Sequence, residues 1–173
     1  MTKIKFGTDG WRAIIAKEFT VENVARVTEA TAVWLKKNFP NPSAVVGHDC
    51  RFAGELFAET STKVLLANGI KVYLAKDFVS TPMVSLGTVH YKTSLGIIIT
   101  ASHNPPSYNG YKLKGNYGGP LMPEQVQEVE DIIPEKANTN YEAVSLAEAE
   151  KSGMLIIAPL EDLYVKRVEE TFD

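Results

Sequence analysis

The sequence predicts an α/β protein, a three-layer α/β/α sandwich with a mixed, mostly parallel four-stranded sheet. Short apolar runs alternate with segments of helical periodicity, which is typical of a sheet covered by helices on both faces. The run at 95–99, LGIII, has no polar side chain, as expected for a central strand buried on both sides. The 173 residues are enough for one domain with a substantial core.

The first helix–strand unit comprises a helix at 21–37 and a short buried strand at 44–47. Apolar residues recur through the helix at helical spacing: Val24, Val27, Trp34 and Leu35. Thr20 is suited to cap its N-terminus, and the prolines at 40 and 42 end it.

Two similar units follow. A helix at 55–68 ends at Gly69, and a strand at 70–75 comes next. A third helix is predicted with Thr81 as its N-cap and Pro82 at its first position, and it leads to the strand at 95–99. Connections between parallel strands of this kind are expected to be right-handed.

After residue 99 the composition shifts to Gly, Asn, Tyr and Pro. Four further elements are predicted: a strand or hairpin at 111–117, a helix at 124–133, a strand at 154–158 and a final helix at 163–172. The polar, acidic segment 134–149 has no core pattern and is expected to be a surface excursion.

Charge and composition exclude several classes of protein. The chain has 18 Lys and Arg against 21 Asp and Glu, a net charge of −3, so it lacks the basic excess of a nucleic-acid or membrane-surface protein. No apolar run reaches about 18 residues, the length that a membrane span requires. The one cysteine, Cys50, allows no internal disulfide and no Cys-rich zinc site, so a cytoplasmic location is expected.

The segment 100–106, TASHNPP, is the first candidate for chemistry because it directly follows the most apolar strand. Ligands of open α/β sheets bind beyond the carboxyl ends of strands, so Ser102 would be presented there on a loop. Lys112 lies ten residues beyond Ser102, after a turn at Asn109-Gly110 that would fold it back. A serine that carries phosphate holds about −1.5 to −2 charge and needs such cations nearby.

Other interpretations of this segment are open at this point. A polar turn without chemistry is an equal alternative. A Ser102–His103 nucleophile pair is disfavoured, since adjacent residues of an extended chain point to opposite sides. The sequence has no Gly-x-Ser-x-Gly elbow and no nucleotide-binding glycine motif, which argues against a serine hydrolase and a nucleotide site.

The segment 100–105, TASHNP, resembles the phosphoserine loop of the α-D-phosphohexomutase family, which includes phosphoglucomutase and phosphomannomutase. Three further segments resemble motifs of that family in the same order: FGTDGWR at 6–12, GHDCR at 47–51 and NGYK at 109–112. The resemblance covers the first of the family's four domains. The family's Asp-x-Asp-x-Asp-Arg magnesium loop is absent from the sequence. Residues 1–173 are therefore expected to be domain I of a longer chain, with 160–173 as the helix that leads to a second domain.

The resemblance implies an isomerase that acts as an intramolecular phosphotransferase. Ser102 would be the phosphoserine, which passes its phosphoryl group to a hexose phosphate and regains one from the bisphosphorylated sugar. Phosphate thereby moves between the 1- and 6-positions of glucose or mannose. Arg12 would be a permanent cation near the reacting oxygens, and Lys112 a general acid/base or a fixed charge. His103 would assist proton transfer or orient the loop.

Structural alternatives accompany these roles. Arg12 would otherwise form an ion pair with Asp9 or Asp49, and Lys112 would be a solvated charge beside a turn. Asp49 and Arg51 are expected to hold loops together at the strand ends.

The resemblance also implies cofactors and partners. Mg²⁺ would be bound in the full-length enzyme, where this chain supplies only the phosphate on Ser102, and a hexose 1,6-bisphosphate would be activator and intermediate. The partners are a hexose phosphate and the remaining domains of the same polypeptide, with no nucleic acid and no membrane. The isolated domain is expected to be largely inactive. The alternative is a non-catalytic sugar-phosphate-binding or interaction domain of the same fold.

Overall fold

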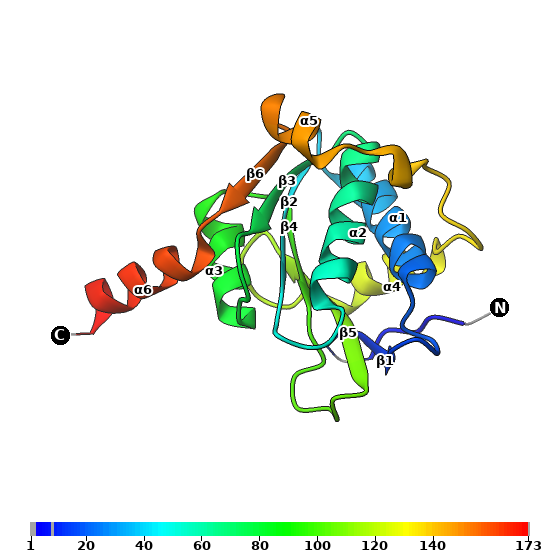
Figure 1. Ribbon diagram of the computed structural model, residues 1–173, viewed down its shortest axis with the longest axis horizontal. Helices are drawn as coiled ribbons and strands as arrows, with labels where there is room; N and C mark the ends of the chain where they lie inside the picture. Colours follow the sequence, from blue (N-terminus) through cyan, green and yellow to red (C-terminus); the bar gives the residue numbers. More distant parts are fainter. Residues whose placement is uncertain (1–2, 8, 173) are drawn as a thin grey trace.

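A six-stranded sheet divides the molecule into layers in the computed structural model, which describes residues 3–7 and 9–172. The strand order is β1-β5-β4-β2-β3-β6. Helices α1, α2 and α4 cover one face, while α3 covers the other and contacts α6 (Figure 1). The predicted three-layer α/β/α class is confirmed, and the predicted number of four strands is wrong.

The strands and helices have the following bounds. The strands are β1 (Trp11–Ile14), β2 (Ser43–His48), β3 (Lys71–Ala75), β4 (Leu95–Ile99), β5 (Tyr108–Gly115) and β6 (Leu155–Ala158). The helices are α1 (Val21–Asn38), α2 (Gly54–Ala67), α3 (Thr81–His90), α4 (Pro123–Asp131), α5 (Leu146–Lys151) and α6 (Leu160–Thr171), with a 3₁₀ turn at Tyr141–Ala143.

The sheet is parallel in its larger part. Strands β4, β2, β3 and β6 run in the same direction, and β5 is antiparallel to both of its neighbours, β4 and β1. The sequence does not reveal β1, because four residues are too few to show an alternation. It also misses α5, a helix of six residues.

Strand β4 is buried on both faces, as predicted. Ile97 and Ile99 pack in the core on the side of α1 and α2, whereas Ile98 packs in the smaller core below α3 and α6. This alternation lets one short strand join both cores, so the loop that follows it leaves from a strand that is packed on both faces.

Helix α1 begins where the sequence predicts. The Thr20 side chain accepts a hydrogen bond from the Asn23 N–H, which satisfies one of the free donors of the first turn. Helix α3 begins at Thr81, and its N-cap is Ser80 rather than the predicted Thr81. The difference is one residue and leaves Pro82 in the first turn, where its missing N–H costs nothing.

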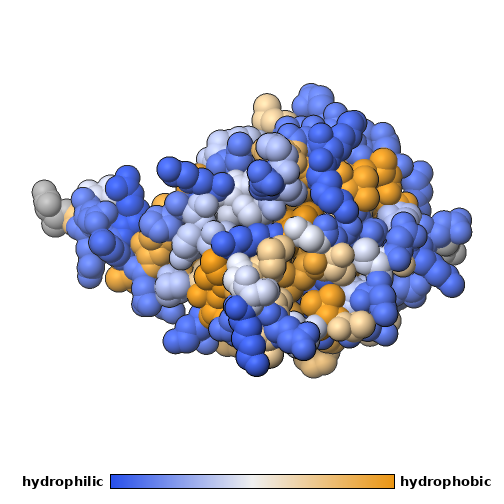
Figure 2. Space-filling view, turned by 90° about the horizontal axis from the view of Figure 1, so that it is seen from above, coloured by the Kyte–Doolittle hydropathy of each residue, from blue (hydrophilic) through white to orange (hydrophobic). Residues whose placement is uncertain are grey.

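The polar segment 134–149 lies on the surface of the molecule as predicted, and it is tied to α1. Arg26 Nε donates to the Pro134 carbonyl over 2.7 Å, and Thr139 Oγ1 donates to Glu29 Oε2 over 2.7 Å. Seen from above, the surface is mostly hydrophilic with separate apolar patches, and α6 extends away from the body (Figure 2). None of the helices in the described ranges is long and apolar enough to span a membrane.

The carboxyl ends of the four parallel strands meet at one edge of the sheet, which positions the candidate site. The loop at 100–107 leaves β4 there, and residues 49–53 leave the neighbouring β2. Strand β5 starts at the same edge because it runs antiparallel to β4. Segments far apart in the sequence therefore lie next to each other at this edge.

Gly96 offers a test of how tightly α3 packs on the sheet. A Cβ at this position would overlap Thr88 Oγ1, which is buried and hydrogen-bonded to the Val84 carbonyl and so has little room to move. We expect Gly96→Ala to lower the free energy of unfolding by about 1–3 kcal/mol in denaturant titrations. The control is Gly7→Ala, where the nearest atom lies at 3.6 Å. Equal free energies of unfolding for Gly96→Ala and Gly7→Ala would contradict tight packing of α3 on the sheet at Gly96.

Candidate active site

Ser102 lies exposed on the loop after β4, in an unusual backbone conformation. Its φ of 56° is left-handed, which non-glycine residues adopt only when their surroundings hold them there. The Ser102 N–H donates to Thr100 Oγ1 over 3.1 Å, and Thr100 Oγ1 donates in turn to Asp49 Oδ2. The hydroxyl group is thus accessible to a ligand, while the backbone behind it is fixed.

Arg51 holds the same loop from the neighbouring strand end. Its Nη2 donates to the carbonyls of Ser102 and Asn104 over 2.8 and 2.7 Å. Its Nη1 donates to the carbonyls of Pro105 and Tyr108 over 2.9 and 3.0 Å. A guanidinium has five donors in one plane, so a single side chain binds four loop carbonyls at once. This is the loop-holding role expected for Arg51.

Asp49 completes this arrangement by orienting Arg51. Its Oδ1 accepts the Arg51 N–H over 3.0 Å, and its Oδ2 lies 3.5 Å from Arg51 Nε. Because Oδ2 also accepts from Thr100, Asp49 joins the ends of β2 and β4. Asp49 thus links the loop to the end of β2, in agreement with the sequence-based expectation.

His103 lies beside the Ser102 hydroxyl, and the expectation that the two side chains point apart is wrong. His103 Nδ1 is 3.4 Å from Ser102 Oγ, and both residues are exposed. The rule of alternating sides holds for an extended chain, but the left-handed conformation of Ser102 breaks it. The imidazole is therefore near the group that would react.

Lys112 is buried in β5, with 4% of its surface exposed, so it is not a solvated charge. Its Nζ donates to Asp9 Oδ2 over 2.7 Å. Within residues 3–7 and 9–172, no hydrogen bond or ion pair joins Lys112 to Ser102. In the sheet Lys112 pairs with Ile98, four positions before Ser102.

Arg12 lies on β1, across from Gly110 of β5. A Cβ at Gly110 would overlap the Thr100 carbonyl and would lie 3.1 Å from Arg12 Cγ, so Arg12 passes close to the base of the Ser102 loop. No ion pair with Asp9 or Asp49 is present in the described part of the chain. Among residues 3–7 and 9–172, Arg12 Nε is a buried donor without a hydrogen-bond partner.

Sequence reasoning missed Lys114 as a member of this site. Lys114 is also 4% exposed, and its Nζ lies 3.5 Å from Asp9 Oδ1. It lies two positions after Lys112, with one residue between them, so both side chains leave the same face of β5. That spacing is the signal that would have identified it. Asp9 lies within the motif at 6–12, and it forms ion pairs with Lys112 and Lys114 rather than with Arg12.

The two lysines determine the charge of Asp9. Burial alone would raise its pKa, but the hydrogen bond from Lys112 and the charges of Lys114 and Lys112 outweigh burial. The pKa of Asp9 therefore lies below its ordinary value of 3.8.

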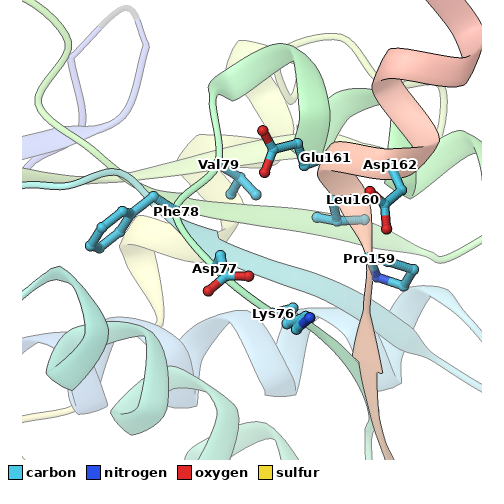
Figure 3. A pocket seen from close by; sticks show the side chains of 8 residues that line it. All are labelled: Lys76, Asp77, Phe78, Val79, Pro159, Leu160, Glu161 and Asp162. Atoms are coloured by element: carbon cyan, nitrogen blue, oxygen red, sulfur yellow. The ribbon is translucent and has the colours of Figure 1, made fainter.

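A separate cavity of about 230 Å³ lies at the same edge of the sheet, beyond the ends of β3 and β6 (Figure 3). Its lining consists of two short segments, Lys76 to Val79 and Pro159 to Asp162. Phe78 is 63% exposed there and packs edge-on against His48.

Cys50 is a free, exposed thiol. No group of three metal-binding side chains occurs among the residues that the structure describes.

Comparisons with known proteins identify the family. The model of the phosphoglucomutase/phosphomannomutase alpha/beta/alpha domain I matches residues 3–140. A phosphoglucomutase of Staphylococcus haemolyticus is 37% identical over 143 residues, which are 79% of this chain and 26% of that protein. A phosphoglucosamine mutase of Clostridium acetobutylicum is 33% identical over 167 residues, 96% of this chain and 36% of that protein. The chain therefore belongs to the phosphoglucomutase/phosphomannomutase family, as its domain I.

Solved structures agree with this assignment. A crystal structure of a Thermus thermophilus protein described as a phosphomannomutase superposes with a TM-score of 0.88 at 34% identity. It covers 99% of this chain, and the chain covers 37% of it. The predicted resemblance to the phosphohexomutases is confirmed. The chain spans between about a quarter and somewhat over a third of the length of these relatives.

Arg51 is tested by its replacement with lysine. An ammonium group cannot bind four carbonyls in one plane, so we expect Arg51→Lys to lower the free energy of unfolding by about 2 kcal/mol. Amide hydrogen exchange should accelerate at Asn104 and Tyr108, whose N–H groups bond within the loop. Arg167→Lys on the exposed face of α6 is the control. Unchanged exchange in the loop of Arg51→Lys would contradict the role of this side chain.

Asp9 is tested by the pH dependence of stability. A carboxyl group with a lowered pKa in the folded state stabilises the fold above its ordinary pKa and loses this effect as pH falls through the lower folded value. We expect wild type to exceed Asp9→Asn in free energy of unfolding at neutral pH, with the difference shrinking below pH 3.8. A difference that is the same at all pH values would show that Asp9 does not act through its charge.

Proposed function

We propose that Ser102 is a phosphoryl carrier and that the chain is the phosphoserine-bearing part of a phosphohexomutase. The observation that carries this proposal is the exposed Ser102 hydroxyl on a loop whose backbone is fixed by Arg51. The family match and the named mutase relatives support the reaction class, an isomerisation by intramolecular phosphotransfer. The sugar and the positions between which phosphate moves are part of the proposal.

The proposed reaction has two phosphoryl transfers. In the first, the bond from phosphorus to Ser102 Oγ breaks while a bond to a hydroxyl oxygen of the sugar phosphate forms; that hydroxyl loses its proton to a base, and Ser102 Oγ takes up a proton. The product is a hexose 1,6-bisphosphate. In the second, the bond from the other phosphate to its sugar oxygen breaks while a bond to Ser102 Oγ forms; the Ser102 hydroxyl loses its proton and the sugar oxygen takes one up. Phosphate thus moves between the 1- and 6-positions, and Ser102 ends phosphorylated as it began.

Catalysis of such transfers depends mainly on position and on stabilisation of charge. The Arg51 and Thr100 contacts fix the Ser102 backbone, so the hydroxyl oxygen needs little reorganisation before reaction. We propose that the free Arg12 Nε binds an oxygen of the transferred phosphoryl group. His103, 3.4 Å from Ser102 Oγ, is the proposed proton donor and acceptor.

This chain supplies one of the proposed ligands of magnesium. The described residues contain no group of three carboxylates, histidines or cysteines that would hold a metal ion. The chain's own contribution to Mg²⁺ binding is therefore the phosphate on Ser102, since phosphate oxygens with carboxylates and water are the usual ligands of this ion. When bound, the ion neutralises charge on the transferred group.

The rest of the enzyme belongs to the proposal as well. The named relatives are about three to four times as long as the matched part, so we propose that the sugar and the metal are bound mainly by further domains of the same polypeptide. Residues 160–173, which include α6, would lead to the second of them. The chain alone is expected to be largely inactive as a mutase. A cytoplasmic location is proposed from its single, free cysteine.

The test is the intact mass of the protein after incubation with a hexose 1,6-bisphosphate and Mg²⁺. We expect a slow gain of one phosphate that is lost in Ser102→Ala. It should be retained in Ser107→Ala, which changes an exposed serine of the same loop. Interconversion of glucose phosphates by residues 1–173 alone at rates typical of enzymes would contradict the expected inactivity.

The alternative function, a non-catalytic sugar-phosphate-binding or interaction domain, predicts a different outcome. No phosphate would be gained even when the remaining domains of a relative are supplied as a separate protein. That result would overturn the proposed role of Ser102.

A further inference from the structure

The two peptide groups on either side of Ser102 are held by different side chains. Arg51 Nη2 donates to the Ser102 carbonyl over 2.8 Å and so holds the peptide group that follows Ser102. The Thr100 hydroxyl accepts the Ser102 N–H over 3.1 Å and so holds the peptide group that precedes it. The φ and ψ angles of a residue set how its two peptide groups are oriented relative to each other. The backbone conformation of Ser102 is therefore defined by both contacts together.

The preceding peptide group is held at both of its ends. Besides the Ser102 N–H, its Ala101 carbonyl accepts the Asn104 N–H over 3.0 Å. The four carbonyls that Arg51 binds all belong to Ser102 and later residues. These contacts of Arg51 thus leave the peptide group between Ala101 and Ser102 to the Thr100 hydroxyl and the loop itself.

The Thr100 hydroxyl has a defined direction. Because a carboxylate oxygen accepts but does not donate, the hydroxyl proton is directed to Asp49 Oδ2. The lone pairs of the hydroxyl oxygen are then left for the Ser102 N–H. Thr100 is 5% exposed, and its own N–H donates to the Gly110 carbonyl over 2.9 Å. A residue held in this way connects the end of β2 to the Ser102 amide.

The conformation of Ser102 decides where His103 lies. In an extended chain the two neighbouring side chains would point to opposite sides. With a φ of 56° at Ser102, His103 Nδ1 lies 3.4 Å from Ser102 Oγ instead. A left-handed backbone is unfavourable for a residue with a Cβ and persists only where its surroundings impose it. Without the Thr100 hydroxyl, Ser102 would be able to return to an extended conformation.

We propose that Thr100 is a positioning residue for phosphoryl transfer. Its hydroxyl fixes the Ser102 amide and thereby keeps Ser102 Oγ beside the His103 imidazole. Thr100 acts through Ser102 and contacts no reacting atom itself. The conformational part of this inference stands on the contacts of Thr100, whereas the catalytic part rests on the proposed function of Ser102.

The conformational part is tested by crystal structures of Thr100→Val and Thr100→Ser. Valine has the shape of threonine but can neither donate nor accept, while serine keeps the hydroxyl. In Thr100→Val we expect Ser102 to leave the left-handed region and the distance from Ser102 Oγ to His103 Nδ1 to exceed about 3.5 Å. Thr100→Ser should keep the wild-type loop. A left-handed Ser102 with His103 in its wild-type place in Thr100→Val would overturn the proposal.

Thr93 provides a matched control at the opposite end of β4. It is 1% exposed, and its hydroxyl lies 3.3 and 3.2 Å from the carbonyls of Thr88 and Leu95. Thr93→Val therefore removes a buried threonine hydroxyl without touching the Ser102 loop. Amide hydrogen exchange at Ser102 should accelerate about tenfold or more in Thr100→Val and stay at the wild-type rate in Thr93→Val. The same exchange rate at Ser102 in both valine variants would contradict the role of Thr100.

The catalytic part is tested by the rate of phosphate gain at Ser102, with the remaining domains of a relative supplied. We expect this rate to fall about tenfold to hundredfold in Thr100→Val, since a reacting group misplaced by about 1 Å costs this much. Thr100→Ser and Thr93→Val should stay within about threefold of wild type, the range of ordinary context effects.

Two other outcomes separate the parts of this inference. Equal slowing in Thr100→Val and Thr93→Val would reveal a general loss of stability and overturn the catalytic part. Failure of the wild-type chain to gain phosphate would instead overturn the proposed function of Ser102, and the crystal structures would still decide the conformational part.

Discussion

The Arg51 guanidinium and the four backbone carbonyls that it binds are the interaction on which the rest of the site depends. Residues 102–107 of the loop are exposed or half-buried, so their carbonyls are not held by core packing. Arg51 binds the four carbonyls through one planar guanidinium and thereby connects the loop to the end of β2. Charge-assisted hydrogen bonds are worth about 1.5–3 kcal/mol each, enough to hold Ser102 in a left-handed conformation that costs about 1–3 kcal/mol.

Parallel strands make this interaction possible. Strands β2 and β4 are neighbours and end at the same edge, so the residues that follow them are brought within hydrogen-bond distance although about fifty positions separate them in the sequence. Asp49 then orients Arg51 and receives the Thr100 hydroxyl. The hydroxyl of Ser102 is left as the exposed group of a rigid loop, which is the arrangement that a transferable phosphoryl group requires.

The cations Arg51, Lys112 and Arg12 differ in the partners that the structure gives them. Arg51 is fully engaged by the loop and by Asp49, and Lys112 by Asp9. Arg12 Nε is buried and has no hydrogen-bond partner in the part of the chain that the structure describes. We infer that Arg12 is the cation free to bind the phosphoryl group, while the engaged cations supply a fixed positive field.

Much of the fold could be predicted because its main elements show strong periodicity. Strand β4 and helix α1 carry continuous apolar patterns over their full length. Strand β1 and helix α5 are short and lie at the margins of the core, so nothing in their residues distinguishes them from loops. Their places are determined by tertiary contacts, since β1 is a strand only because β5 pairs with it.

The candidate site was predicted in its members more than in its geometry. The motifs identified Ser102, Lys112 and Arg12, but the proximity of His103 to Ser102 depends on a backbone conformation that no residue type reveals. An ion pair of Arg12 with Asp9 or Asp49 was the structural alternative, whereas the sheet register presents two lysines of β5 to Asp9.

The role of Ser102 and its surroundings is tested most directly by a crystal structure of the chain with phosphate attached. We predict phosphate on Ser102 Oγ, an unchanged set of four Arg51 contacts and a phosphate oxygen within about 3 Å of Arg12 Nε. Phosphate on another side chain, or a loop released from Arg51 to accommodate it, would contradict these roles.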